Sequence, residues 1–226
     1  MTGTLVNAAA IIAGSLLGVT LKKGLPDRLR QTLMYAIGLG VLLIGTRMAL
    51  QSQNVLIVLA SLVLGGIVGE LINIEGYLDK FGRFIQSRVD ENSSIAKAFV
   101  TASLLYCVGS MAVMGALESG LTGNHTTLYA KSILDGVTSI IFASTLGIGV
   151  IFSALPVLLY QGAITLAASL LQPLLTPAAV AEMTGTGGLL IIGIGLNVLE
   201  IKKLKVGNLL PGIFFALILS TAAAYF

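Results

Sequence analysis

Eight long runs of apolar residues dominate the sequence and leave little of it for anything but helices that cross a membrane. The runs lie near residues 3–21, 29–50, 54–73, 95–117, 127–146, 149–172, 186–201 and 207–226. A spanning helix needs about 20 apolar residues, because each residue rises about 1.5 Å and the hydrocarbon layer is about 30 Å thick. Unpaired backbone groups in lipid are costly, so the runs predict an all-α, polytopic transmembrane helix bundle of about eight spans.

Composition supports the same class. Of the 226 residues, 56% are hydrophobic and only 10% are charged, whereas soluble domains carry about a quarter of their residues as Asp, Glu, Lys and Arg. We therefore expect one integral membrane domain over residues 1–226. Cys107 is the only cysteine and His125 the only histidine, so no intramolecular disulfide or Cys/His zinc cluster can form. No metal, cofactor, enzymatic activity or nucleic-acid partner is predicted.

Basic residues gather in alternate connections between the predicted spans. They follow the first, third and seventh spans, as Lys22, Lys23, Arg28 and Arg30, then Lys80, Arg83, Arg88 and Lys97, then Lys202, Lys203 and Lys205. The other connections hold little more than Arg47, Glu118, His125 and Glu182. Because basic residues are retained on the cytoplasmic side, this pattern predicts that both termini lie outside the cytoplasm, which eight spans allow.

Residues 74–94 form the one substantial region that is not expected to cross the bilayer. Its apolar residues recur at helical spacing, as Tyr77, Leu78, Phe81, Phe84, Ile85 and Val89. Asp79, Lys80, Arg83 and Gln86 occupy the opposite face. The pattern predicts an amphipathic connector along the cytoplasmic interface, and its mixed charges favour a simple connector over a lipid sensor.

An internal repeat is indicated when the chain is compared with itself at a shift of about 95 residues. Gly14-Ser15 then matches Gly109-Ser110, and Gly66 matches Gly162 at a shift of about 96. Each three-helix unit, 1–73 and 95–172, has an odd number of spans, so the second copy is inverted. Inverted repeats are typical of secondary transporters, whose sites lie near the midplane. The remaining helix pair, 186–226, is expected to serve as an oligomer contact or a lid.

Asp135, in the sequence SILDGVTS, gives the strongest functional signal. A carboxylate near mid-membrane costs several kcal/mol unless it is paired, protonated or in contact with water. Lys131 lies one helical turn earlier and is able to pair with it. Two interpretations follow: Asp135 binds a cation or proton, or the Lys131–Asp135 pair only fastens helices.

Gln161 is expected at a similar depth in the sixth run, downstream of Gly147, Gly149 and Pro156. Glycines and a proline in an apolar run indicate a kinked or broken helix, whose free backbone groups can bind a substrate or ion. The alternative is a kink that serves only packing.

Other polar residues in the spans are weaker candidates. Substrate or ion binding is considered for Asn7, Ser110, Asn197 and Asn208, although such side chains often only join helices. Glu70 and Glu200, near cytoplasmic ends, are candidates for gating or cation binding, with anchoring at the interface as the alternative. Two glycine pairs, Gly14/Gly18 and Gly65/Gly69, favour close helix contact.

Several sequence blocks, in the same order along the chain, resemble one bacterial family. They include TGTLVNAAAIIAGSLLG, LGGIVGELINIEGYLDKFG, AKSILDGVTSIIFASTLGIGVIFSALPVLLYQG and GGLLIIGIGLN. Over essentially its whole length the chain resembles the YqgA/YdfK-like inner-membrane family, a domain-of-unknown-function family. The resemblance implies a multi-pass protein of the bacterial cytoplasmic (inner) membrane, of a kind often assigned to transport. Asn7, Asp135, Gln161, Asn197 and Asn208 are the candidates on matching positions.

The leading hypothesis is a transporter or channel for a small solute or ion, with proton or cation coupling through Asp135. Its expected partners are the lipid bilayer, the solute or ion, and further copies of itself in a homo-oligomer. The alternative is a non-transporting membrane scaffold or accessory subunit, which binds a partner protein through glycine-rich helix faces. In that case the Lys131–Asp135 pair is purely structural.

Overall fold

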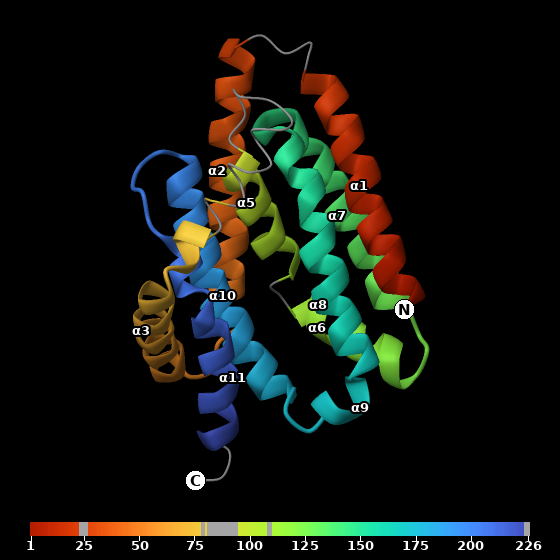
Figure 1. Cartoon of the computed structure of the whole chain (residues 1–226), viewed down its shortest axis with the longest axis vertical. Coiled ribbons are helices and arrows are strands. Elements are labelled where there is room, and N and C mark those ends of the chain that lie inside the picture. Colours follow the sequence, from red (N-terminus) through yellow and green to blue (C-terminus); the bar gives the residue numbers. More distant parts are fainter. Residues whose placement is uncertain (23–26, 78–79, 81–94, 108–109, 224–226) are drawn as a thin grey trace. The chain divides into compact units, whose positions relative to one another are not determined.

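The computed structural model describes residues 1–22, 27–77, 80, 95–107 and 110–223, and within them all regular secondary structure is helical. Figure 1 shows its helices and their order. Most of the predicted amphipathic connector at 74–94 lies outside the described residues. The all-α class is confirmed.

Six described helical segments are long and apolar enough to cross a membrane: Thr2–Leu21, Gln31–Ala49, Val55–Ile72, Ile148–Leu166, Pro177–Val198 and Val206–Ala223. The helices α5 (Ile95–Cys107) and α6 (Ser110–Leu121) are bent by 56° and together make a seventh candidate. The predicted span at 127–146 is helix α7 (Thr126–Leu146), which is not among them, because Lys131, Asp135 and several Ser and Thr residues lower its hydropathy. The count of eight spans stays a prediction.

By its contacts the chain divides into two compact units. The first unit comprises Met1–Met34, Leu78–Cys107 and Met111–Leu170. Helix α1 (Thr2–Lys22) lies along α7, and it also contacts α8 (Ala154–Leu166) and the short 3₁₀ helix η1 (Ile148–Ser153), as Figure 1 shows. Helix α5 packs against α7, η1 and α8. The short helix α9 (Ala168–Leu171) follows α8.

Two glycines allow α1 to approach α7 closely. A Cβ atom at Gly14 would meet the carbonyl oxygen of Gly136, and one at Gly18 would meet the carbonyl oxygen of Ile140. At the start of α1, a Cβ atom at Gly3 would lie 2.8 Å from the Cβ of Leu128. The contacts follow in the same order along both helices, so α1 and α7 run in the same direction. The predicted close contact at the Gly14/Gly18 pair is confirmed.

The break predicted within the sixth run is not seen where the glycines and the proline suggested it: Ile148–Leu166 is one continuous helical segment, and the chain turns before it, at Gly147. Its φ of 93° is in a region that L side chains rarely adopt. Residues Ile148–Ser153 then form η1, and Pro156 lies in the first turn of α8, where its missing N–H removes no helical hydrogen bond. Gln161 therefore lies within regular helix, well past the turn at Gly147.

The second unit comprises Tyr35–Tyr77, Val108–Ser110 and Leu171–Phe226. It holds most of α2 (Asp27–Ala49), together with α3 (Val55–Ile72), α10 (Pro177–Val198), η2 (Val206–Leu209) and α11 (Pro211–Ala223). Helix α3 packs on α11, and α10 contacts both. Gly65 and Gly69 face the backbone of Gly212 and Asn208 closely, as their spacing predicted.

Helix α10 begins at Pro177, earlier than the predicted start near 186. Thr176 caps it by accepting a hydrogen bond from the Ala179 amide at 3.2 Å, and Pro177 suits the first turn. The prediction that Glu182 lies in a connection is therefore wrong. Glu182 is 3% exposed inside α10. Its carboxylate accepts hydrogen bonds from the Ser52 hydroxyl at 2.6 Å and from the Gln53 and Asn54 amides at 2.8 and 3.0 Å.

Asn54 caps the following helix, α3, and its loss should be measurable. Its side-chain oxygen accepts hydrogen bonds from the Leu56 and Ile57 amides at 3.1 and 3.4 Å. We expect Asn54→Ala to lower the free energy of unfolding by about 1 kcal/mol, measured by denaturant titration in detergent micelles. Gln53→Ala, at an exposed neighbour, is the matched control. An equal loss in both variants would contradict the capping role.

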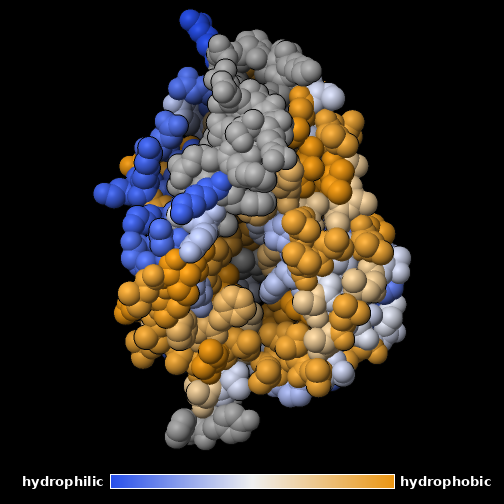
Figure 2. Space-filling view, in the orientation of Figure 1, coloured by the Kyte–Doolittle hydropathy of each residue, from blue (hydrophilic) through white to orange (hydrophobic). Residues whose placement is uncertain are grey.

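The outer faces of the helices carry large apolar side chains. Exposed fractions reach 57% at Leu17 of α1, 69% at Ile133 of α7 and 61% at Val63 of α3. On the side that it draws, Figure 2 shows broad apolar surface in orange, whereas hydrophilic residues cover the loop after α10, where Lys202, Lys203 and Lys205 are exposed. Such apolar surfaces are suited to lipid contact and are rare on soluble monomers.

Candidate functional site

Four polar side chains from three helices meet inside the first unit. Asn7 comes from α1, Lys131 and Asp135 from α7, and Gln161 from α8. Their exposed fractions are 0% for Asn7 and Gln161, 5% for Asp135 and 7% for Lys131. These four residues are named the polar cluster below.

The ion pair in the polar cluster joins two residues of one helix. The Nζ atom of Lys131 lies 3.0 Å from Oδ1 and 2.9 Å from Oδ2 of Asp135. The spacing of four residues brings the two side chains to the same face of α7, as the sequence suggested. Both side chains are more than nine-tenths buried, so each charge depends on the other.

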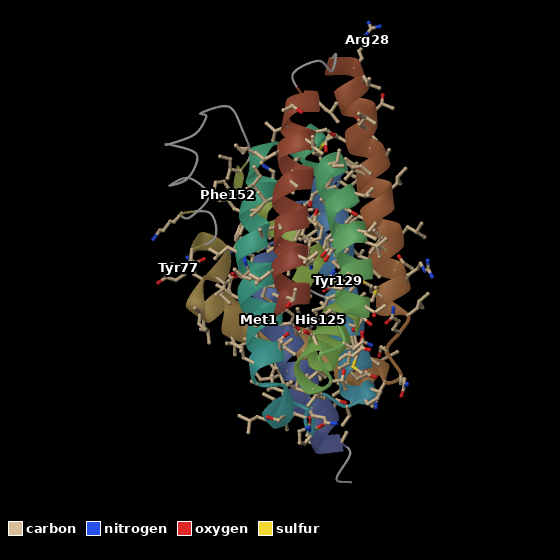
Figure 3. All side chains as sticks on the ribbon, turned by 90° about the vertical axis from the view of Figure 1, so that its right-hand side faces the viewer. Met1, Arg28, Tyr77, His125, Tyr129 and Phe152 are labelled. Atoms are coloured by element: carbon tan, nitrogen blue, oxygen red, sulfur yellow. The ribbon has the colours of Figure 1, made fainter. Side chains whose placement is uncertain are left out.

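Asn7 connects this ion pair to α8. Its Nδ2 atom donates hydrogen bonds to Oδ2 of Asp135 at 3.0 Å and to Oε1 of Gln161 at 3.3 Å. One side-chain amide therefore joins α1, α7 and α8. The start of α1 lies next to the start of α7, and Figure 3 shows Met1 beside His125 and Tyr129. His125 shares a hydrogen bond of 2.9 Å with the Ser119 hydroxyl.

Two atoms of the polar cluster are among eight buried side-chain N and O atoms that have no hydrogen-bond partner in the described part of the chain. Six of them belong to the first unit: Thr4 Oγ1, Asn7 Oδ1, Ser15 Oγ, Ser103 Oγ, Gln161 Nε2 and Thr165 Oγ1. An unpaired buried polar atom costs about 1–3 kcal/mol, so native proteins usually pair such atoms with water or a ligand. Thr4 lies one turn before Asn7, and Thr165 one turn after Gln161, on the same helix faces.

A second polar contact continues the cluster along α7. Ser139, one turn after Asp135, donates a hydrogen bond from its hydroxyl to the Tyr106 hydroxyl of α5 at 2.9 Å, and both residues are fully buried. Four residues near the site were not predicted from the sequence: Thr4, Thr165, Ser139 and Tyr106. The signal for two of them is helical spacing, because Ser139 continues the four-residue interval from Lys131 to Asp135, and Thr4 precedes Asn7 by three residues.

Two apolar grooves flank α1 in the first unit. One, of about 460 Å³, lies between α1 and α7 and is lined by residues including Val6, Gly14 and Ile133. The other, of about 250 Å³, lies between α1 and the η1–α8 segment, beside Ile12 and Leu155. Neither groove has Asn7, Asp135 or Gln161 in its described lining. The polar cluster is therefore separate from both grooves.

Three predicted site residues fasten connections within the second unit instead. Asn197 exchanges hydrogen bonds with the backbone of Leu204, at 2.8 Å from Nδ2 and 2.7 Å to Oδ1. Glu70 accepts hydrogen bonds from Lys205 at 2.7 Å and from the Asn208 amide. The bond to Glu70 raises the pKa of Lys205 above its ordinary value. Asn208 also accepts a hydrogen bond from the Glu75 amide at 2.7 Å.

The two remaining predicted residues join no described cluster. Glu200 is exposed, with a φ of 60°, just after α10. Ser110 is the first residue of α6, and its side chain lies outside the described part of the structure. Within the described residues, no group of three or more His, Cys, Asp or Glu side chains is placed to hold a metal ion.

Comparison with known proteins places the whole chain in one group. The model of the family described as protein of unknown function (DUF554) matches residues 2–221. Uncharacterized membrane protein YdfK of Bacillus subtilis (strain 168) is 37% identical over 217 residues, which cover 94% of this chain and 93% of YdfK. Uncharacterized protein YqgA of Escherichia coli (strain K12) is 33% identical over 226 residues, which cover 97% of this chain and 96% of YqgA. No solved structure matches the chain.

Proposed function

The chain belongs to the DUF554 family, and from the polar cluster within its apolar helices we propose that it moves a small solute or ion across the bacterial cytoplasmic membrane. The polar cluster would be the place where the solute binds. Helices α1, α7 and α8 would form the wall of the pathway.

The unpaired atoms around the polar cluster carry this proposal. A cluster that only fastened three helices would be expected to pair its own polar atoms, because each unpaired one costs stability. Here four buried polar atoms in the cluster or one helical turn from it, on Thr4, Asn7, Gln161 and Thr165, have no partner among the described residues. Polar groups of a passing solute, or water that accompanies it, would supply those partners.

The ion pair provides a way to couple transport to a proton or cation. A proton on Asp135, or a cation beside it, would compete with Lys131 for the carboxylate and free the ammonium group to move. The described titratable groups around Asp135 are Lys131 on its own helix and Tyr106 and Cys107 on α5. The state with a proton or cation at Asp135 and the state without one would then favour different orientations of the binding site. The inverted repeat predicted from the sequence would relate these two orientations.

Asp135→Asn tests the proposal directly. The purified protein is reconstituted in liposomes, and flux is measured for protons, alkali cations and small neutral solutes against protein-free liposomes. We expect at least one solute to move faster with the wild-type protein, and Asp135→Asn to lower that flux about tenfold or more, since a charged hydrogen-bond acceptor is lost. The double variant Lys131→Met/Asp135→Asn, which leaves no buried charge, controls for an effect of the unpaired lysine.

The alternative function, a membrane scaffold or accessory subunit, is favoured by one observation. The Lys131–Asp135 pair is complete without any solute. This alternative predicts that no solute in the panel moves faster with the wild-type protein, and that Asp135→Asn changes only the melting temperature. Normal flux through the Asp135→Asn variant would instead support transport as the function but show that Asp135 takes no part in it. The predicted homo-oligomer is a separate proposal, which light scattering of the purified protein tests.

A further inference from the structure

We infer that the solute is electrically neutral and carries a hydrogen-bond donor next to an acceptor, as a small carboxamide or urea does. The inference rests on the proposed function, and it names the chemical class that the polar cluster would bind. Three features of the polar cluster support it: its charge balance, the chemical type of its unpaired atoms, and the hydroxyl groups one turn away.

Charge balance disfavours an ion as the principal solute. The positive charge of Lys131 and the negative charge of Asp135 lie 2.9 Å apart and cancel. The other members of the cluster, Asn7 and Gln161, are neutral amides. An ion that entered would be a third, unbalanced charge among buried groups, unless it first separated the ion pair. A neutral solute adds no third charge and leaves the ion pair intact.

The two unpaired amide atoms of the polar cluster are of opposite type. Asn7 Oδ1 is a hydrogen-bond acceptor and Gln161 Nε2 is a donor, and both are fully buried. They belong to amide groups that already touch, since Asn7 Nδ2 donates to Gln161 Oε1 at 3.3 Å. The complementary solute therefore donates to Asn7 and accepts from Gln161. A carboxamide or a urea has both groups on one carbon atom.

Hydroxyl groups extend this pattern without adding charge. Thr4 and Thr165 lie one turn from Asn7 and Gln161, and both hydroxyl oxygens are buried without a partner among the described residues. A hydroxyl group either donates or accepts, so these two residues would pair with the remaining N–H and C=O groups of the solute. The set of unpaired atoms thus matches a small solute that is polar over most of its surface.

Two pairs of probes of nearly equal shape separate charge from size. Urea is compared with guanidinium, and acetamide with acetate, by stopped-flow light scattering of proteoliposomes, with protein-free liposomes subtracted. We expect protein-dependent uptake of urea or acetamide, and uptake of guanidinium and acetate no faster than in protein-free liposomes. Uptake of the charged member of either pair without its neutral partner overturns the inference but leaves the proposed function intact. If none of the four probes enters, the inference is wrong, and the proposed function is decided separately by the wider solute panel.

Gln161→Glu tests whether the polar cluster sets this preference. It replaces the unpaired donor by an acceptor of nearly the same size and adds a negative charge, so we expect neutral uptake to fall about tenfold or more and guanidinium uptake to appear. Gln161→Leu, which removes the amide and adds no charge, serves if the first variant does not fold; it should lose neutral uptake without gaining guanidinium uptake. Ser61→Ala is the matched control, because it removes a buried unpaired oxygen within the second unit. Unchanged neutral uptake in a folded Gln161 variant would overturn the inference.

Discussion

Replacing Lys131 by Met should lower the free energy of unfolding by about 3–5 kcal/mol, because it leaves the Asp135 carboxylate buried without its cation. The carboxylate would keep only the hydrogen bond from Asn7 Nδ2 at 3.0 Å among the contacts described. The Asp135 side chain is short and 5% exposed, so it cannot reach water without a change in the helix. Unfolding in mixed detergent micelles measures the loss.

Asp135→Asn, which leaves the Lys131 ammonium without its anion, is expected to lower the free energy of unfolding by less than Lys131→Met does. In Asp135→Asn the buried cation belongs to a flexible side chain of four methylene groups, which can extend toward solvent or lose its proton. The double variant Lys131→Met/Asp135→Asn removes both charges and should recover most of the stability lost in Lys131→Met. If the single losses simply add in the double variant, the two residues do not stabilise each other, and the ion pair has no energetic role.

Gly14→Ala should destabilise the first unit by about 3 kcal/mol, the second large effect that the structure predicts. The added methyl group would meet the carbonyl oxygen of Gly136, a backbone atom that cannot rotate away as a side chain can. It would also lie about 3.2 Å from the Cβ of Ser139. Helices α1 and α7 would have to separate, and the hydrogen bond from Asn7 to Asp135 would lengthen with them.

Gly40 provides the matched control, because the same methyl group there would meet nothing within 4 Å. Alanine favours a helix over glycine by up to about 1 kcal/mol, so Gly40→Ala is expected to leave stability unchanged or to raise it slightly. The melting temperatures of the two purified variants give the comparison. Equal melting temperatures would show that the close approach at Gly14 does not limit packing.

The sequence predicted the local part of the candidate site well. The interval between Lys131 and Asp135 places both on one face of any helix, so their pairing follows from helix geometry alone. The polarity of Asn7 and Gln161 in apolar runs also identified them as candidates. Their meeting with Asp135 depends on how α1, α7 and α8 pack, however, and a single sequence contains no direct record of which helices touch.

The same limit explains the errors. The seventh apolar run begins near residue 186, so the sequence predicts Glu182 in the connection before it. Its partners at Ser52, Gln53 and Asn54 lie about 130 residues away and make its burial favourable. Asn197 has hydrogen-bonding partners in a loop that the sequence could not position. Polarity within an apolar run therefore identifies residues that need partners, but not what those partners are.

The long separation along the chain between α1 and its partners has a consequence for biosynthesis. The partners of Asn7 lie 128 and 154 residues later, at Asp135 and Gln161. At a synthesis rate of about 5–20 residues per second, α1 is complete on the order of ten seconds before those partners leave the ribosome. During this interval the face that carries Thr4, Asn7 and Ser15 lacks its eventual neighbours on α7 and α8. Helix α1 is thus made well before α7 and α8, and it reaches its final packing only after both of them are made.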